Sequence, residues 1–406
     1  MAALNGDGRL DLISPDYNEN AVLVFTNMGN GNFAPAVSYP VGGNPYAVAA
    51  ADLNRDGKVD LISANSYDNT LLVLTNNGRG IFGSNATYAV GSSPRAVIAA
   101  DINGSGRLAL ISANYNGNTL SVLTNNGHGG FGSNATYTVG ANPVAVIAAD
   151  LNGSGRPALI AANYEADTLS IYTNNGSGVF GSNATVNASV GASDVIYSVV
   201  AADIYGTGRP ALVCADYYGR ALLVLTNNGS GRFGSNATLH AGVTVTWGAA
   251  ADVNGDGRVD LIAVENYGNA LLVFTNNGAG IFSSNASYAI GNYPVQAVAA
   301  DLNNDGKVDL IGVNLFSSSL SVLTNATVFP APAGLPAVVI KRTGPGLLVS
   351  WPSASAGWSL QQNANLANKT WLPSGYGGYG VADDGTNKSL TVPTTPGNSL
   401  FRLLHP

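Results

Sequence analysis

Short apolar segments alternate with loops rich in Gly and Asn along most of the chain. Residues 46–90, "YAVAAADLNRDGKVDLISANSYDNTLLVLTNNGRGIFGSNATYAV", show this pattern once through. Each apolar run is about four to eight residues long, is rich in Val, Ile, Leu and Tyr, and ends at Gly or Asn, as β-strands do. No 3.6-residue period persists in the sequence. The pattern therefore predicts an all-β fold.

The pattern is also an internal repeat. The aspartate that opens each polar loop recurs at spacings of 49, 49, 53, 49 and 49 residues. These aspartates are Asp52, Asp101, Asp150, Asp203, Asp252 and Asp301. Each unit holds four strand-like runs, and "TNNG" marks a tight turn between the third and the fourth. Counting back 49 residues from Asp52 reaches Ala3, so the chain starts inside a seventh unit.

Four antiparallel strands in each of seven units predict a seven-bladed β-propeller of about 49 residues per blade over residues 1–327. A parallel β-helix is the alternative, although its repeats are usually shorter and have fewer hairpins. Residues 328–336 are rich in Pro, Gly and Ala and are predicted to be a linker. Residues 337–406 contain further strand-like runs and are predicted to form a small β-sandwich.

The loops that follow the first strand of a unit carry side-chain oxygens in the pattern D-x-N-x-D-G-x-x-D. Hard cations such as Ca2+ take six to eight oxygen ligands, and alternate residues of a tight loop converge on one point. The loop is too short for an EF-hand. Three loops are complete, with predicted calcium ligands Asp52, Asn54, Asp56, the Lys58 carbonyl and Asp60; Asp252, Asn254, Asp256, the Arg258 carbonyl and Asp260; and Asp301, Asn303, Asp305, the Lys307 carbonyl and Asp309. A weaker set is Asn5, Asp7 and Asp11, because Ala3 replaces the first aspartate.

This motif between strands, followed by "NNGxGxFG", resembles the FG-GAP repeats of integrin-alpha propellers and their bacterial VCBS-type relatives. The resemblance covers residues 1 to about 325 and recurs in phase. It implies a seven-bladed propeller with structural calcium in the loops between the first and second strands, here about three sites. It also implies an extracellular or cell-surface location.

The three middle loops depart from this motif. Ser105 and Ala109, Ser154 and Ala158, and Thr207 and Ala211 replace the second and third carboxylates of the third, fourth and fifth units. We expect these loops to be turns without metal, held by hydrogen bonds from Asp and Ser side chains.

Composition narrows the range of partners. Only 10% of the residues are charged and the net charge is −7, which argues against nucleic acid and anionic membrane surfaces as partners. No apolar stretch approaches the ~20 residues of a membrane span, so membrane insertion is not expected. The start of the chain lacks the features of a signal peptide. The single cysteine, Cys214, lies in an apolar run and is expected to be a buried free thiol.

The sequon "NAT" or "NAS" recurs and marks candidate sites of N-glycosylation. The candidates are Asn85, Asn134, Asn183, Asn236, Asn285 and Asn325. The alternative is a polar edge strand copied by repeat duplication.

Aromatic residues follow the second strand of each unit, in loops expected on the face opposite the calcium loops. They are Tyr17, Tyr67, Tyr115, Tyr164, Tyr217, Tyr267 and Phe316. Such a ring forms a candidate binding face for sugar rings or for a protein surface. The alternative is that each ring packs against its neighbouring blade.

No arrangement of catalytic residues is evident. His128, His240 and His405 are isolated, and the aspartates outside the loops form no clear pair. The protein is therefore predicted not to be an enzyme, with a secreted polysaccharide-degrading enzyme as the least favoured reading. The favoured function is an extracellular structural or adhesive module that binds protein or glycan at the cell surface. The alternative is a lectin-like propeller.

The first unit starts too late to include its first strand, since Met1 lies two residues before Ala3. Three segments could fill this position: a C-terminal part of the same chain, residues upstream of Met1, or a strand from a neighbouring subunit. The third possibility would make the protein a subunit of a fibre or surface layer, with copies of itself as partners.

Overall fold

The computed structural model describes residues 1–29, 31–188, 195–229 and 231–326, and of the remainder residues 339–343, 346–352, 359–363, 372–373, 382–383, 387–393 and 400–404. The chain divides into two compact units, Met1–Thr327 and Val328–Pro406. The predicted linker, residues 328–336, lies outside the described residues. Strands form all the regular secondary structure of the described ranges.

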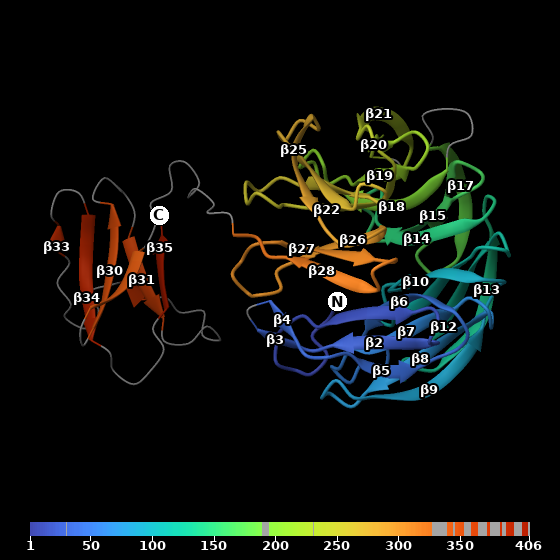
Figure 1. The fold of residues 1–406 in the computed structure, drawn as a ribbon, viewed down its shortest axis with the longest axis horizontal. Helices are drawn as coiled ribbons and strands as arrows, with labels where there is room; N and C mark the ends of the chain where they lie inside the picture. The colour runs from blue at the N-terminus through green and yellow to red at the C-terminus, as the bar shows by residue number, and fades with distance from the viewer. Residues whose placement is uncertain are drawn as a thin grey trace. The chain divides into compact units, whose positions relative to one another are not determined.

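The first unit is a seven-bladed β-propeller whose sheets are arranged around a ring (Figure 1). Blades 2 to 6 each have four strands, joined in sequence order. They are β6 (Pro45–Ala51), β7 (Asp60–Asn65), β8 (Thr70–Asn76) and β9 (Phe82–Ala89); β10 (Pro94–Ala100), β11 (Ala109–Asn114), β12 (Thr119–Asn125) and β13 (Phe131–Thr138); β14 (Pro143–Ala149), β15 (Ala158–Asn163), β16 (Thr168–Asn174) and β17 (Phe180–Asn187); β18 (Ile196–Ala202), β19 (Ala211–Asp216), β20 (Ala221–Asn227) and β21 (Phe233–His240); and β22 (Val245–Ala251), β23 (Asp260–Glu265), β24 (Ala270–Asn276) and β25 (Phe282–Ala289).

Blades 1 and 7 each have three strands among the described residues. Blade 1 contains β1 (Leu12–Asp16), β2 (Ala21–Phe25) and β5 (Val37–Pro40), with the short hairpin β3 (Asn27–Gly29) and β4 (Asn32–Phe33) between β2 and β5. Blade 7 contains β26 (Pro294–Ala300), β27 (Asp309–Asn314) and β28 (Ser319–Leu323). The predicted all-β class and the seven-bladed propeller are confirmed.

Every pair of neighbouring strands within a blade is antiparallel, and the second strand is the most buried. All six residues of β7 are buried, because blades 1 and 3 cover its two sides. Leu61 packs with blade 1 residues such as Val22, whereas the next residue, Ile62, packs with blade 3 residues such as Leu110. Successive side chains of a strand point to opposite faces of the sheet, so β7 packs against blade 1 on one face and blade 3 on the other.

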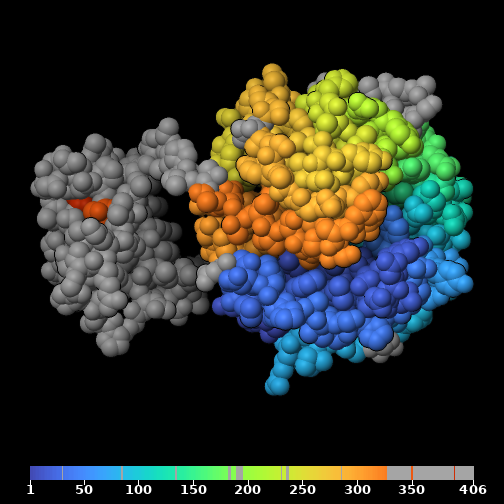
Figure 2. Space-filling model, in the orientation of Figure 1, coloured from blue at the N-terminus to red at the C-terminus, as the bar shows by residue number. Residues whose placement is uncertain are grey.

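The ring closes between the first and the last blade, which lie side by side in Figure 2 as the dark blue and orange surfaces. Leu12 of blade 1 shares a buried apolar cluster with Leu302 and Ile311 of blade 7. The first-strand position of blade 1 is represented by one bridge, Ala2 to Asp11, which matches the pairing of Ala51 with Asp60 in blade 2. Which segment lies beside the rest of β1 stays a prediction.

A β-bulge begins the inner strand of every blade from the second onward. In β6 the pairing with β7 shifts between Pro45 and Ala47, so that Tyr46 has no partner in the ladder. Such bulges re-aim the side chain of the extra residue. The equivalent residues are Tyr46, Arg95, Val144, Tyr197, Thr246 and Val295.

The second unit contains two antiparallel sheets. One has the order β29 (Val339–Thr343), β30 (Gly346–Pro352), β34 (Asn387–Pro393) and β33 (Ala382–Asp383); the other has the order β32 (Leu372–Pro373), β31 (Ser359–Asn363) and β35 (Leu400–Leu404).

Cys214 lies in β19 at the centre of a blade, and its thiol is fully buried. Burial raises the pKa of the thiol well above its usual value, and the Asp216 carboxylate raises it further. We therefore expect the native protein not to react with Ellman's reagent at pH 8, and to release one equivalent of thionitrobenzoate in guanidinium chloride. Rapid reaction of the native protein would contradict the packing of β19.

Candidate functional site

The loops of the propeller gather on two faces, because neighbouring strands within each blade are antiparallel. The loops between first and second strands and between third and fourth strands lie on one face, which we call the calcium-loop face. The loops between second and third strands and the connections between blades lie on the other, which we call the aromatic face. The predicted metal ligands and the predicted aromatic ring therefore lie on opposite faces.

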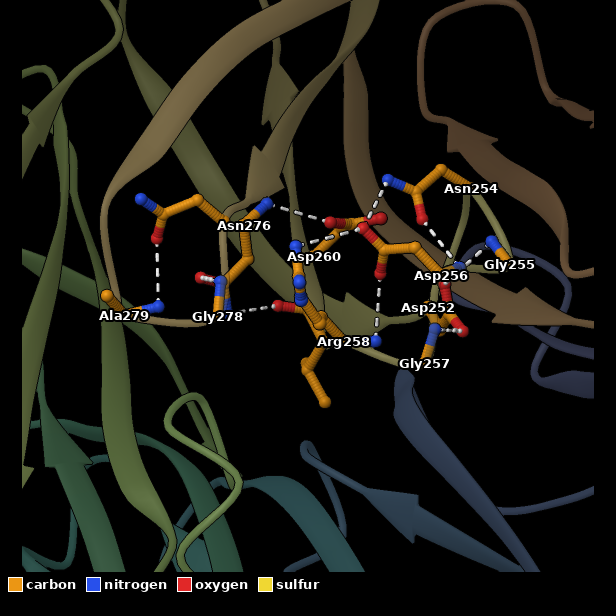
Figure 3. Close-up of polar contacts among 12 residues, drawn as sticks. Asp252, Asn254, Gly255, Asp256, Gly257, Arg258, Asp260, Asn276, Gly278 and Ala279 are labelled. Carbon is orange, nitrogen blue, oxygen red and sulfur yellow. Dashed lines mark hydrogen bonds and ion pairs between the residues drawn. The ribbon is translucent and has the colours of Figure 1, made fainter. Parts of the chain in front are cut away.

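The complete loops are folded around their first aspartate. In blade 6, Asp252 Oδ1 accepts hydrogen bonds from the backbone N–H groups of Gly255 at 2.7 Å and Asp256 at 3.1 Å (Figure 3). Asp252 Oδ2 accepts the N–H of Gly257 at 2.8 Å. Gly257 has a φ of 82°, a conformation that glycine adopts without strain. This carboxylate thus fixes the turn.

The last aspartate of each loop is held differently, as the start of β23 shows. Asp260 is fully buried, and its two oxygens accept the N–H groups of Val253 at 3.1 Å and Asn276 at 2.9 Å (Figure 3). Burial raises the pKa of Asp260, and the nearby Asp256 carboxylate also raises it, against the two backbone hydrogen bonds that lower it. The same arrangement recurs at Asp11, Asp60 and Asp309.

The middle loops keep the turn with fewer carboxylates. Asp101 Oδ2 accepts the N–H of Gly106 at 2.7 Å, and Ser105 Oγ accepts the N–H of Arg107 at 3.2 Å. Asp150 and Asp203 hold their loops in the same way. The expected Asp and Ser hydrogen bonds are therefore present. The six loops that begin with an aspartate share this turn, and three of them lack the later carboxylates, so those carboxylates are not needed to form it.

The donor chemistry of the complete loops fits a hard cation. Burial raises the pKa of Asp60, and the nearby Asp56 and Asp52 carboxylates raise it further, a repulsion that a divalent cation would relieve. Lys58 offsets part of this charge through an exposed ion pair of 3.4 Å with Asp56. Similar pairs link Arg9 to Asp7, Arg258 to Asp256 and Lys307 to Asp305. In the ranges that the structure covers, no three His, Cys, Asp or Glu side chains are grouped so that they could hold a metal ion, so calcium at these loops stays a prediction.

A set of asparagines that joins the blades was not foreseen from the sequence. The first Asn of each "TNNG" turn donates its side-chain amide to a loop carbonyl of the preceding blade, as Asn276 does to Ile204 at 2.8 Å. It also donates to a carbonyl of its own blade, here Val259 at 3.0 Å. We call these residues the inter-blade asparagines: Asn27, Asn76, Asn125, Asn174, Asn227, Asn276 and Asn325.

One predicted glycosylation site is therefore in doubt for a structural reason. Asn325 is an inter-blade asparagine, and its amide nitrogen donates to Val253 at 2.8 Å and Val308 at 3.1 Å. A glycan on this nitrogen would replace one of its two hydrogens, so at least one of these hydrogen bonds would be lost. The other five sequons lie in the outer strands β9, β13, β17, β21 and β25, and the side chains of their asparagines lie outside the described part of the structure.

The predicted aromatic residues lie together on the aromatic face but differ in exposure. Four are exposed, with Tyr67 at 77%, Phe316 at 70%, Tyr267 at 65% and Tyr17 at 48%. Tyr217 is buried, and its hydroxyl lies 3.1 Å from that of Tyr267. The exposed members fit the predicted binding face, and Tyr217 fits the alternative of packing between blades.

Two further tyrosines connect this ring, and neither was predicted. The bulge residue Tyr197 lies 5.0 Å from Tyr164 and 5.1 Å from Tyr217, measured between ring centroids. Tyr293, which precedes β26, lies 5.5 Å from Tyr267 and is stacked on Phe316 at 4.3 Å. Burial raises the pKa of Tyr197 well above its usual value, and the neighbouring Tyr164, Tyr217 and Tyr293 raise it further. These rings form one cluster across the inner strands of blades 4 to 7.

Arg95 continues the ring on the side of blades 2 and 3. Its guanidinium carbon lies 3.4 Å from the ring centroid of Tyr115 and 5.0 Å from that of Tyr46. Tyr46 in turn contacts Tyr17 edge to face, at 6.4 Å between centroids. A cation held between two aromatic rings fixes their orientation. The repeat pattern could have revealed Arg95 and Tyr46, because both are bulge residues at equivalent positions.

The model of the FG-GAP-like repeat family matches six overlapping segments of the chain, residues 4–63, 52–112, 101–161, 150–214, 203–263 and 252–312. Among curated proteins, none is similar in sequence. Within the described ranges, no helix has the length and apolar character that would be needed to cross a membrane.

Several solved structures share the fold. BBS1N, in a crystal structure with ARL6DN, is similar over 81% of this chain and 92% of its own, with a TM-score of 0.58 and 13% identity. A putative 6-phosphogluconolactonase from Bacteroides uniformis is similar over 97% of this chain and 99% of its own, with a TM-score of 0.58 and 13% identity. The periplasmic gluconolactonase PpgL of Pseudomonas aeruginosa is similar over 77% and 88%, with a TM-score of 0.52 and 13% identity.

These likenesses correct one prediction. The prediction that the protein is not an enzyme is wrong, because propellers of this fold include a putative 6-phosphogluconolactonase and a gluconolactonase. The statement depended on the absence of known catalytic motifs, but a propeller can assemble an active site from residues of several blades that are far apart in sequence. At 13% identity these structures share the fold and carry no activity over to this chain.

Proposed function

Because this chain belongs to the FG-GAP-like repeat family, we propose that it acts as an extracellular interaction module, with the aromatic face as its binding surface. The observation that carries this proposal is the concentration of exposed rings, including Tyr67, Tyr267 and Phe316, on that one face. Monomeric proteins rarely expose many large apolar side chains together unless the surface binds something. A protein complex of another propeller, BBS1N, is consistent with a binding role for the fold.

The proposal includes calcium at the three complete loops, where it would act as a structural ion. The ligands would be the side chains of the loops that start at Asp52, Asp252 and Asp301, completed by backbone carbonyls. Calcium would supply positive charge to a group of crowded carboxylates and would leave the aromatic face unchanged. The loops lie on the opposite face from the rings, so metal and partner would bind independently.

The double variant Tyr267→Ala/Phe316→Ala tests the binding face. We expect it to reduce binding at least about tenfold, equivalent to about 1.4 kcal/mol, because exposed aromatic side chains commonly dominate binding surfaces. The probe is an array that carries neutral glycans, acidic glycans and envelope proteins of the producing organism. Binding is measured as the fluorescence of labelled protein over a concentration series.

A matched control removes equally exposed apolar side chains from the calcium-loop face. Ile81 and Ile281 are 58% and 65% exposed, in turns between third and fourth strands. The variant Ile81→Ala/Ile281→Ala should bind as the wild type does. Equal losses in both double variants, or no loss in either, would show that the aromatic face is not the binding surface.

A further inference from the structure

A hollow of about 290 Å³ opens on the aromatic face between blades 1, 2 and 3. Its walls come from the loops after the second strands of these blades and from the connections that lead into β6 and β10. It is lined by Tyr17, Asn44, Ser66, Tyr67, Asn69, Ser92, Ser93 and Asn116.

The hollow lies where blade 2 has a serine in place of the tyrosine found at the equivalent position of blades 1, 3, 4 and 5; blades 6 and 7 have Asn266 and Leu315 there. The backbone N–H of Tyr115 donates to the carbonyl of Ser93 at 2.8 Å, and that of Tyr164 donates to Asn142 at 3.0 Å. Ser66 makes the equivalent hydrogen bond to Asn44 at 3.0 Å, so it occupies the same position in blade 2. A serine side chain leaves open the space that a tyrosine ring fills in blades 3 and 4.

The polar groups around the hollow are held in place by the fold. Asn69 Oδ1 accepts the N–H of Ser93 at 2.7 Å, and the hydroxyls of Ser66 and Ser93 lie 2.8 Å apart. The Asn44 amide donates to the carbonyl of Tyr17 at 3.2 Å. These contacts use only part of the hydrogen-bonding capacity of the Asn and Ser side chains that line the hollow. A rim of this kind is fixed before a ligand binds, which lowers the entropy cost of binding.

The chemistry of the lining selects an uncharged ligand. All eight lining residues are neutral, and the carboxylate of nearby Asp68 accepts the N–H of Gly43 at 2.6 Å. Amide and hydroxyl groups match the alternating donors and acceptors of sugar hydroxyls. The exposed ring of Tyr67 provides an apolar surface for the C–H face of a sugar. The volume lies near the lower end of the range for ligand pockets, which favours a short saccharide.

From these observations we infer that the hollow at Ser66 binds a neutral saccharide unit of the size of a mono- or disaccharide. This inference rests on the proposed role of the aromatic face in binding, and it gives that face one ligand class and one location. The aromatic rings of blades 5 to 7 lie outside the hollow and are not required for it.

The variant Ser66→Tyr is the sharpest test, because the molecule already accepts tyrosine at this position in neighbouring blades. We expect it to fold as the wild type does, as checked by circular dichroism and thermal unfolding, and to lose at least tenfold in affinity. The probes are glucose, galactose, mannose, N-acetylglucosamine, cellobiose and lactose, with glucuronic acid as a charged probe. Binding is measured by saturation-transfer NMR and by calorimetry at up to about 50 mM sugar.

Three controls separate the possible outcomes. Ser66→Ala keeps the hollow open and should retain binding, whereas Tyr67→Ala removes the stacking surface and should weaken it. The variant Ile81→Ala/Ile281→Ala, on the opposite face, should leave binding of these sugars unchanged. The inference is overturned if no neutral sugar binds, if only glucuronic acid binds, or if Ser66→Tyr binds as the wild type does. If Tyr267→Ala/Phe316→Ala nevertheless loses array binding, the proposed face stands and the saccharide hollow alone is wrong.

Discussion

Excess EGTA is expected to lower the midpoint of thermal unfolding of the propeller by about 10–15 °C. Each calcium site contributes about 2.7 kcal/mol when free calcium is a hundredfold above its Kd, and three sites would contribute about 8 kcal/mol. A domain larger than 200 residues changes its midpoint by about 2 °C per kcal/mol. The physical cause is the return of repulsion among carboxylates such as Asp52, Asp56 and Asp60, the last of which is fully buried. Differential scanning calorimetry with 1 mM calcium, about a hundredfold above a micromolar-range Kd, and with EGTA measures the shift.

The chain supplies its own control for this prediction. The change of Asp56→Ser and Asp60→Ala gives the loop of blade 2 the residues found at Ser105 and Ala109 in blade 3. This variant should bind one calcium ion fewer in isothermal titration and should show a smaller shift with EGTA. Identical melting curves of the wild type with calcium and with EGTA would refute the calcium sites.

Asn27→Ala is expected to destabilise the ring at its closure by about 2–4 kcal/mol, because it leaves buried backbone carbonyls without a donor. Asn27 is 1% exposed and donates to Leu302 of blade 7 at 2.8 Å and to Leu10 at 3.0 Å. Within residues 1–326 no loop joins blade 7 directly to blade 1, since Asn27 and Leu302 are 275 residues apart. We therefore expect hydrogen exchange to accelerate in β1 and β27 before the rest of the propeller unfolds.

Asn174→Ala is the matched control for the closure. Asn174 donates to Ile102 of blade 3 at 2.6 Å and to Pro157 of its own blade 4 at 3.1 Å, so the variant loses an equivalent pair of hydrogen bonds, one of them between blades. The peptide between β13 and β14 still joins these blades, so their exchange should change only close to Asn174. Equal local opening in both variants would show that the closure is no weaker than the other interfaces.

The sequence predicts the blades well because the repeat imposes the same local rules seven times. Consecutive apolar residues such as Leu61 and Ile62 point to opposite faces of a strand, so both faces must be buried. A ring of blades buries both. The turn around Asp252 could also be predicted, since Asp, Asn and Gly occur where their side chains and φ values are needed.

The inter-blade asparagines and the hollow could not be predicted, because they depend on contacts between repeat units that the sequence of one unit does not reveal. Asn276 is part of a common turn sequence, and only the ring places Ile204 of the preceding blade next to its amide. Asn325 carries a sequon and yet occupies the inter-blade position, because the last unit omits the segment that follows in the others. Ser66 is one of three residues, with Asn266 and Leu315, that replace tyrosine at this position of the ring, and only the fold shows which neighbours line the hollow beside it.

The four loops that keep their last aspartate are consecutive around the ring, in blades 6, 7, 1 and 2, because blade 7 adjoins blade 1. Between their first and ninth positions these loops hold eleven carboxylates and five cationic side chains, a formal charge of −6, whereas the three loops of blades 3 to 5 hold three of each. Without a bound cation these loops therefore make one half of the ring more negative than the other, which contributes an electric dipole in the plane of the ring. Three calcium ions carry six positive charges and would nearly cancel it. Calcium would then affect the orientation of the propeller near a charged surface, in addition to the stability of the propeller.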